Sequence, residues 1–116
     1  QHLFIEAFPD RNPILFTIGL LFNERCVCRL DYDTTATHSN NWAPGLPPFV
    51  RGPHWHSWEL NRDELRKRPS QLLRLHYAIE FTQARAFDAC LRWYCDTRKI
   101  TLGPHGIDYP HKSFLL

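Results

Sequence analysis

Long apolar runs are scarce in this sequence of 116 residues. The longest, Ile14 to Phe22, is too short to span a bilayer. It begins after Asp10, and no small-residue cleavage site follows it, so we do not expect a signal peptide. These absences exclude a membrane-spanning protein and favour a soluble globular domain without a membrane partner.

The sequence motifs of several large enzyme classes are missing as well. There is no Gly-rich dinucleotide-binding motif, no P-loop and no nucleophile elbow, and the chain has neither an internal repeat nor a low-complexity tract. Candidate functional residues therefore have to be sought among the histidines, the arginines and the aromatic residues.

A strong charge of one sign is also lacking. The 14 Lys and Arg residues exceed the 12 Asp and Glu residues by two, and the positive excess lies in the second half of the chain. Most of the cations are Arg, whose planar guanidinium binds phosphate or carboxylate groups as a fork. This balance permits a nucleic-acid partner, but the net positive charge is smaller than is usual for a nucleic-acid-binding domain.

The four cysteines have the spacing of neither a zinc site nor an obvious disulfide. Cys26 and Cys28 share one face of a predicted strand, about 7 Å apart, which is too far for easy bridging. Cys90 and Cys95 lie on a predicted helix, and neither pair has the gap typical of zinc-binding cysteines. The alternative is a disulfide between one cysteine of the strand pair and one of the helix pair. We expect four reduced, mostly buried thiols and hence a cytoplasmic protein.

The composition is that of one folded domain, with 43% hydrophobic and 14% aromatic residues. The segment from Leu3 to Phe8 predicts a short strand. Residues 14–33 predict a hairpin whose tight turn is Asn23-Glu24. In its second strand the even-numbered residues suit the core, whereas the odd-numbered ones face the other way, with Val27 as the exception. We treat residues 1–116 as a single domain.

Residues 34–53 contain four prolines and two glycines and predict a long loop of a kind that is often functional. A strand near 54–60 is expected next, followed by one or two helical turns from Asn61 to Arg68. The clearest helix spans about 83–98, where apolar residues recur at helical spacing, and residues 101–116 predict an irregular tail. Strands followed by a helix indicate an α+β fold, in which a C-terminal helix packs on one face of a small antiparallel sheet.

Three of the seven histidines lie around the predicted loop, namely His38, His54 and His56. On a strand, His54 and His56 project from the same face. Such a pair can begin a metal site that a loop ligand completes, and it also suits general acid–base catalysis. Arg29 and Asp31 would join the histidines if their two strands were neighbours. The alternative is that the histidine strand is a packing segment and that Arg29 and Asp31 belong to a solvated charged face.

The chain continues with a basic segment that is accompanied by two tryptophans. Its candidate nucleic-acid-binding residues are Trp55, Trp58, Arg62, Arg66, Lys67 and Arg68. Cations track a phosphate backbone and aromatic faces stack on unpaired bases, so the segment predicts an interface with RNA. The alternative is a solvated helix face with the tryptophans in the core.

These motifs follow one another in the order Arg29-Leu30-Asp31, His38, then His54-Trp55-His56. The order resembles a pattern in small uncharacterised microbial proteins that have an Arg-x-Asp strand, a lone loop histidine and a His-x-His strand. Some of those proteins are linked to toxin–antitoxin or phage-defence loci. The resemblance covers about residues 15–98 and implies a nucleic-acid-directed activity.

Our first expectation is a small cytoplasmic protein that acts on RNA, as a metal-independent, toxin-like endoribonuclease without a cofactor. His54 and His56 would be its base and acid, and His38 could substitute for either. Arg29 would stabilise the charge that develops on the phosphate, and Asp31 would orient an imidazole.

Two alternatives come from other classes of protein. A zinc-binding module would place His38, His54 and His56 around the ion, with Asp31 beside them. A non-catalytic interaction protein, such as a phage-encoded inhibitor or an antitoxin partner, would instead form a stable complex with a cognate protein.

Overall fold

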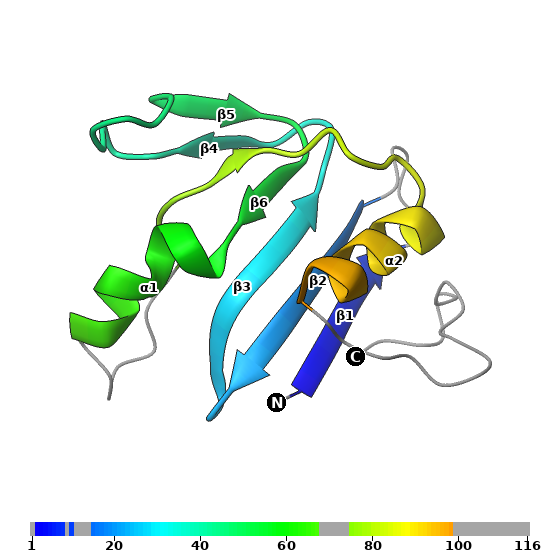
Figure 1. Ribbon diagram of the computed structural model, residues 1–116. Coiled ribbons are helices and arrows are strands. Elements are labelled where there is room, and N and C mark those ends of the chain that lie inside the picture. The colour runs from blue at the N-terminus through cyan, green and yellow to red at the C-terminus, as the bar shows by residue number, and fades with distance from the viewer. Residues whose placement is uncertain (1, 9, 11–14, 68–74, 99–116) are drawn as a thin grey trace.

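The computed structural model describes residues 2–8, 10, 15–67 and 75–98, and it has an α+β fold (Figure 1). A five-stranded antiparallel sheet has the order β1-β2-β3-β6-β7, and β4 and β5 form a second, small sheet. One helix, α1, follows β6, and the other, α2, lies across the larger sheet. The predicted fold class is therefore confirmed.

The elements follow the chain in this order: β1 His2–Phe8, β2 Leu15–Phe22, β3 Arg25–Tyr32, β4 Thr37–Ser39, β5 Phe49–Arg51, β6 His54–His56, α1 Trp58–Lys67, β7 Ile79–Glu80 and α2 Phe87–Arg98.

The hairpin predicted at residues 14–33 is present as β2 and β3. Asn23 and Glu24 form its turn with φ angles of 50° and 64°, the twist that a two-residue hairpin turn needs. A register shift between Leu20 and Leu21 makes the pairing skip Val27. This bulge explains why Val27 departs from the alternation of the strand.

One face of the larger sheet packs against α2 and forms the core (Figure 1). The ring of Phe16 meets the ring of Phe87 edge-on, with centroids 5.2 Å apart. The hydroxyl of Tyr94 donates to the carbonyl of Cys28 at 3.1 Å. The expectation that the C-terminal helix covers one face of the sheet is therefore confirmed.

The segment predicted as a loop, 34–53, contains the small second sheet. The backbone N–H of Asn40 donates to the carbonyl of Pro48 at 2.9 Å and extends the β4–β5 pairing. The prolines lie between or beyond the strands, so none removes a donor from the ladder. Each strand has only three residues, which is too short for alternation to reveal it in the sequence.

The strand predicted near 54–60 ends at His56, because the chain enters α1 at Trp58. The hydroxyl of Ser57 accepts a hydrogen bond from the backbone N–H of Leu60 at 3.2 Å, which is the bond of a helix N-cap. The sequence indicated helical turns only from residue 61, so the helix starts about one turn earlier than expected.

The second helix, α2, begins at Phe87 rather than near residue 83. Phe81 and Phe87 are both buried in the core. A continuous helix would place side chains six residues apart about 120° away from each other around its axis. The non-helical stretch between them lets both rings reach the same core.

Two buried asparagines hold residues 77 and 78 in place. The side-chain amide of Asn40 donates to the carbonyl of Ala78 at 2.9 Å and accepts from its N–H at 2.8 Å. Asn61 makes the same two bonds with Tyr77, both at 2.9 Å. Each amide pairs with the backbone as a neighbouring strand would, and together they fix the chain next to His76.

All four cysteines are free thiols, and three of them are buried. The tail predicted at residues 101–116 lies outside the described residues. Within the described ranges, no helix is both long enough and apolar enough to cross a membrane.

Trp55 belongs to the core and not to a nucleic-acid interface. Its side chain is 5% exposed, and its ring packs edge-on against Trp93 and Tyr94 at centroid distances of 5.1 and 5.3 Å. A buried ring has no face free for a base, so the stacking role predicted for Trp55 does not fit its position in the core.

We expect Asn40→Ala to lower the free energy of unfolding by about 2–3 kcal/mol, because it leaves the buried N–H and C=O of Ala78 without partners. The control Thr37→Ala changes an exposed side chain of β4, the strand that ends just before Asn40, and should alter stability by less than about 0.5 kcal/mol. Urea unfolding of both variants measures the difference. Equal midpoints would contradict the role of Asn40.

We expect Trp55→Ala to lower the free energy of unfolding by about 3–5 kcal/mol, because it empties a large core position. Trp58→Ala should cost less, since that indole is only half-buried. Thermal unfolding followed by circular dichroism compares the two variants. A Trp55→Ala protein of parental stability would show that the ring is not part of the core.

Candidate functional site

The face of the sheet opposite α2 carries four of the predicted site residues. In the pairing of β3 with β6, Arg29 lies opposite His56 and Asp31 lies opposite His54. Side chains directly opposite each other point to the same face of a sheet. The hairpin strand and the histidine strand are therefore neighbours, as the sequence analysis required for these four side chains to meet.

The carboxylate of Asp31 is the centre of this group. The Nε atom of Arg29 donates to Oδ2 at 3.0 Å and lies 2.9 Å from Oδ1 as an ion pair. Its Oδ1 also accepts a hydrogen bond from the hydroxyl of Thr17 at 3.2 Å. Its Oδ2 lies 3.3 Å from Nε2 of His54 and 3.2 Å from Nε2 of His56. One carboxylate thus joins a guanidinium to two imidazoles.

The third histidine reaches the group from the small sheet, where His38 is the middle residue of β4. Its ring stacks on that of His54 at a centroid distance of 5.3 Å and meets that of His56 edge-on at 4.7 Å. One ring nitrogen from each of the three histidines lies within 4.8 Å of the others. We call His38, His54 and His56 the histidine cluster.

Backbone carbonyls orient two of the three imidazoles. Nδ1 of His54 donates to the carbonyl of Gly52 at 2.9 Å, and Nε2 of His38 donates to the carbonyl of His76 at 2.7 Å. A carbonyl oxygen can only accept, so each of these nitrogens carries a proton. In the neutral rings the other nitrogen, Nε2 of His54 or Nδ1 of His38, then keeps a lone pair.

His56 is the most deeply buried member, with 1% of its surface exposed. Neither of its ring nitrogens has a hydrogen-bond partner among the residues that the structure describes. Its Nε2 lies close to Asp31, but the contact does not have the geometry of a hydrogen bond. A buried imidazole that is left unsatisfied in this way requires an explanation.

The ionisable groups of the site influence one another. Burial raises the pKa of Asp31, but His54, His56 and Arg29 outweigh it and bring that pKa well below its ordinary value. Burial lowers the pKa of His54, but Asp31 and the Gly52 carbonyl outweigh it and raise that pKa. For His56, burial prevails over Asp31 and lowers the pKa.

The pKa of His38 is also lowered, because burial prevails over the hydrogen bond to the His76 carbonyl.

The cysteines offer no comparable chemistry. Burial raises the pKa of Cys26 to about 11 and that of Cys90 to about 12, so neither is a thiolate at neutral pH. The imidazoles are therefore the stronger candidates for chemistry near pH 7.

The donor atoms fit a metal ion. Zinc binds nitrogen and oxygen at about 2.0–2.1 Å, which places neighbouring ligand atoms of a tetrahedral site about 3.3–3.4 Å apart. The two contacts between Asp31 and the imidazoles, at 3.3 and 3.2 Å, match this spacing. The histidine nitrogens lie within 4.8 Å of one another, so a movement of at most about 1.4 Å brings them to the same spacing.

The predicted basic segment lies on α1, apart from Arg68, which falls outside the described residues. Arg62 and Arg66 are exposed, and the Arg66 guanidinium lies 5.5 Å from the centroid of the Trp58 ring. Lys67 forms an ion pair with Glu64 at 3.3 Å. Two of the expected phosphate-binding cations thus already have partners within the helix, and the nucleic-acid role of the segment stays a prediction.

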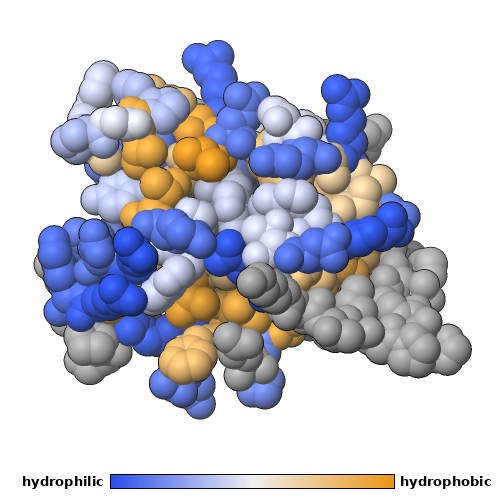
Figure 2. All heavy atoms as spheres, viewed as in Figure 1, coloured by the Kyte–Doolittle hydropathy of each residue, from blue (hydrophilic) through white to orange (hydrophobic). Residues whose placement is uncertain are grey.

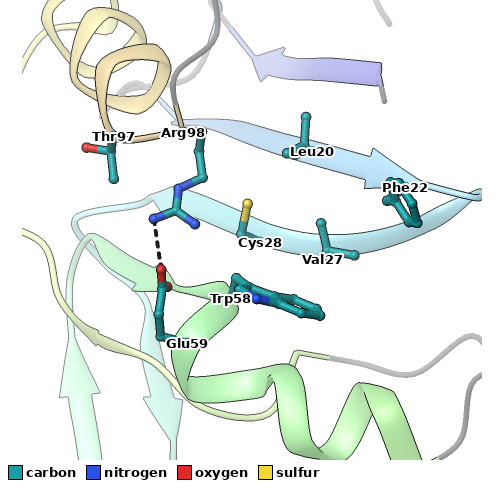
Figure 3. Close-up of a pocket in the computed structure, with 8 residues that line it drawn as sticks. All are labelled: Leu20, Phe22, Val27, Cys28, Trp58, Glu59, Thr97 and Arg98. Carbon is teal, nitrogen blue, oxygen red and sulfur yellow. Dashed lines mark hydrogen bonds and ion pairs between the residues drawn. The ribbon is translucent and has the colours of Figure 1, made fainter.

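A pocket of about 450 Å³ lies between the two helices, on the α2 face of the sheet. The ion pair between Glu59 and Arg98 links the helices across it (Figure 3). Figure 2 shows hydrophobic surface at this position, beside the hydrophilic surface of α1. Cys28 lines the pocket while Arg29 points to the opposite face, so the pocket is separate from the histidine cluster.

The groups that orient the site were not predicted from the sequence. Thr17 lies opposite Asp31 in the β2–β3 pairing, and the alternation of the predicted hairpin could have placed it there. The carbonyls of Gly52 and His76 could not be found in this way, because every residue has a carbonyl and only the fold decides which one a ring meets.

Comparison with known proteins adds no assignment. No family model matches the chain, and neither a curated protein nor a solved structure matches it.

Proposed function

We propose that this protein is a zinc-binding protein whose metal ion is held by His38, His54 and His56. The observation that supports this proposal best is the state of the three rings. Two are held by backbone carbonyls with a lone pair available, and the third is buried with no hydrogen bond among the described residues. Metal-binding histidines typically donate their other ring N–H to such a carbonyl or to a carboxylate.

The residues around the cluster have distinct roles in this proposal. Nδ1 of His38 and Nε2 of His54 are the ligand atoms that the carbonyl contacts leave available. Oδ2 of Asp31 is close enough to both Nε2 atoms to be a fourth ligand. Thr17 and the Nε atom of Arg29 hold that carboxylate in position. A bound zinc ion would supply Lewis acidity, which the chain's own residues lack.

We expect the protein, expressed without a His tag, to bind about one zinc ion per chain, as measured by elemental analysis after gel filtration. His54→Ala should reduce the bound zinc to a small fraction, because it removes a ligand from the centre of the cluster. The control His76→Ala keeps the carbonyl that orients His38, removes only an imidazole outside the cluster and should retain full zinc.

Parental protein that leaves gel filtration without zinc, after refolding in its presence, would contradict the proposal. Equal zinc in the His54→Ala and parental proteins would also contradict it, because the metal would then be bound elsewhere. Circular dichroism of each variant shows whether the fold is retained.

One observation favours a second function, the metal-independent endoribonuclease. The pKa of His54 is raised and that of His56 is lowered, although both contact the same carboxylate. Two titratable groups with pKa values moved apart are the arrangement of a general acid and a general base. Arg29 lies beside them for a phosphate. The burial of both imidazoles limits contact with a polymer, so this function ranks second.

If this second function is correct, purified protein should cleave single-stranded RNA in the presence of EDTA. The double variant His54→Ala, His56→Ala should lose at least about 10²-fold in rate, since an acid–base group contributes about 10²–10⁴-fold. The matched control is the His76→Ala variant. Cleavage that is unchanged in the double variant, or that EDTA abolishes, would rule out the metal-independent reaction at these histidines.

A further inference from the structure

The guanidinium of Arg29 uses only part of its hydrogen-bonding capacity. Its Nε atom donates to the Asp31 carboxylate. Within the described part of the chain, its two terminal Nη atoms have no hydrogen-bond partner. An arginine fork that is anchored through Nε and left open at its terminal nitrogens is positioned to bind a second anion.

The charges of the site favour such an anion once a metal ion is present. The negative charge of Asp31 is balanced by the positive charge of Arg29, with which it pairs. Metal-bound imidazoles are neutral, so the two positive charges of a zinc ion stay uncompensated. The exposed carboxylate of Glu80 lies across from His54 on β7, on the side away from β3. An anion is therefore favoured on the Arg29 side.

Access to the cluster from solvent is greater beside Arg29 than at the two β6 histidines. The side chains of His54 and His56 are 7% and 1% exposed, whereas that of Arg29 is 33% exposed. Arg29 and His56 are direct cross-strand neighbours, which places the guanidinium at the edge of the cluster. A ligand that approaches from this side meets the guanidinium of Arg29 before the buried imidazoles.

We propose that Arg29 and the metal ion of the histidine cluster form one oxyanion site, whose ligand is a phosphate or carboxylate group bound by both. This inference rests on the zinc site proposed above. One oxygen of the anion would be a fifth ligand of the ion, beside the three imidazoles and Asp31, and another would accept from the Nη atoms of Arg29. The substrate class of the site is thus an oxyanion rather than a neutral molecule.

Cobalt(II) can replace zinc as a spectroscopic probe, because its visible absorption changes when an anion enters its coordination sphere. The cobalt-loaded full chain is titrated with inorganic phosphate and, separately, with acetate. We expect a saturable spectral change with at least one of them. Tighter binding of phosphate identifies a phosphoryl ligand, and tighter binding of acetate identifies a carboxylate.

Arg29→Gln should weaken binding of the anion at least tenfold. Because Arg29 also holds Asp31, the cobalt content and spectrum of the variant are measured first without anion, and anion affinities are compared at full cobalt loading. Arg29→Lys, which keeps the charge but not the fork, should give an intermediate affinity. The matched control, Arg62→Gln, removes an exposed arginine of α1 and should bind the anion as the parent does.

Two results would overturn this inference while leaving the zinc site intact: a parental protein that binds cobalt but shows no change with either anion, or an Arg29→Gln protein of parental anion affinity. Failure of the parent to bind cobalt at all would overturn the zinc site itself, and this inference with it. Because cobalt uptake is measured before any anion is added, the two failures are distinguishable.

Discussion

The pairing of β3 with β6 in a single register links the core to the candidate site. Leu30 lies opposite Trp55, and both are buried on the α2 face, so the core fixes this register from one side of the sheet. The same pairing brings Asp31 opposite His54 on the other face. A slip of one residue would exchange the two faces and lose the core and the site together. Apolar packing thus maintains a polar cluster that would be unfavourable by itself.

The small sheet brings the third histidine, and its position depends on buried amides. Asn40 and Asn61 pair with residues 77 and 78, and the neighbouring His76 carbonyl orients His38. These bonds are fully made, whereas His56 is buried without a hydrogen bond among the described residues. An unsatisfied buried polar group costs about 1–3 kcal/mol. A bound metal ion would satisfy one of the two ring nitrogens and so reduce this cost, and binding to the folded state alone would stabilise the fold.

Part of the site could be predicted from the sequence because it follows strand periodicity. Alternation placed Arg29 and Asp31 on the polar face and paired His54 with His56, and the structure brings these residues together. The approach of His38 could be stated only as a hypothesis, since the strands that carry it are too short to show a period. The burial of Trp55 could not be read from composition, because an indole suits a core and a nucleic-acid interface equally well.

X-ray absorption at the zinc edge of the stoichiometrically loaded protein tests the central claim most directly, because it measures the atoms that surround the ion. A site built from the histidine cluster predicts nitrogen and oxygen neighbours at about 2.0–2.1 Å, with the outer-shell scattering of three imidazoles. A shell of sulfur atoms at about 2.3 Å would place the ion on the cysteines instead, and a spectrum without imidazole scattering would contradict the site outright.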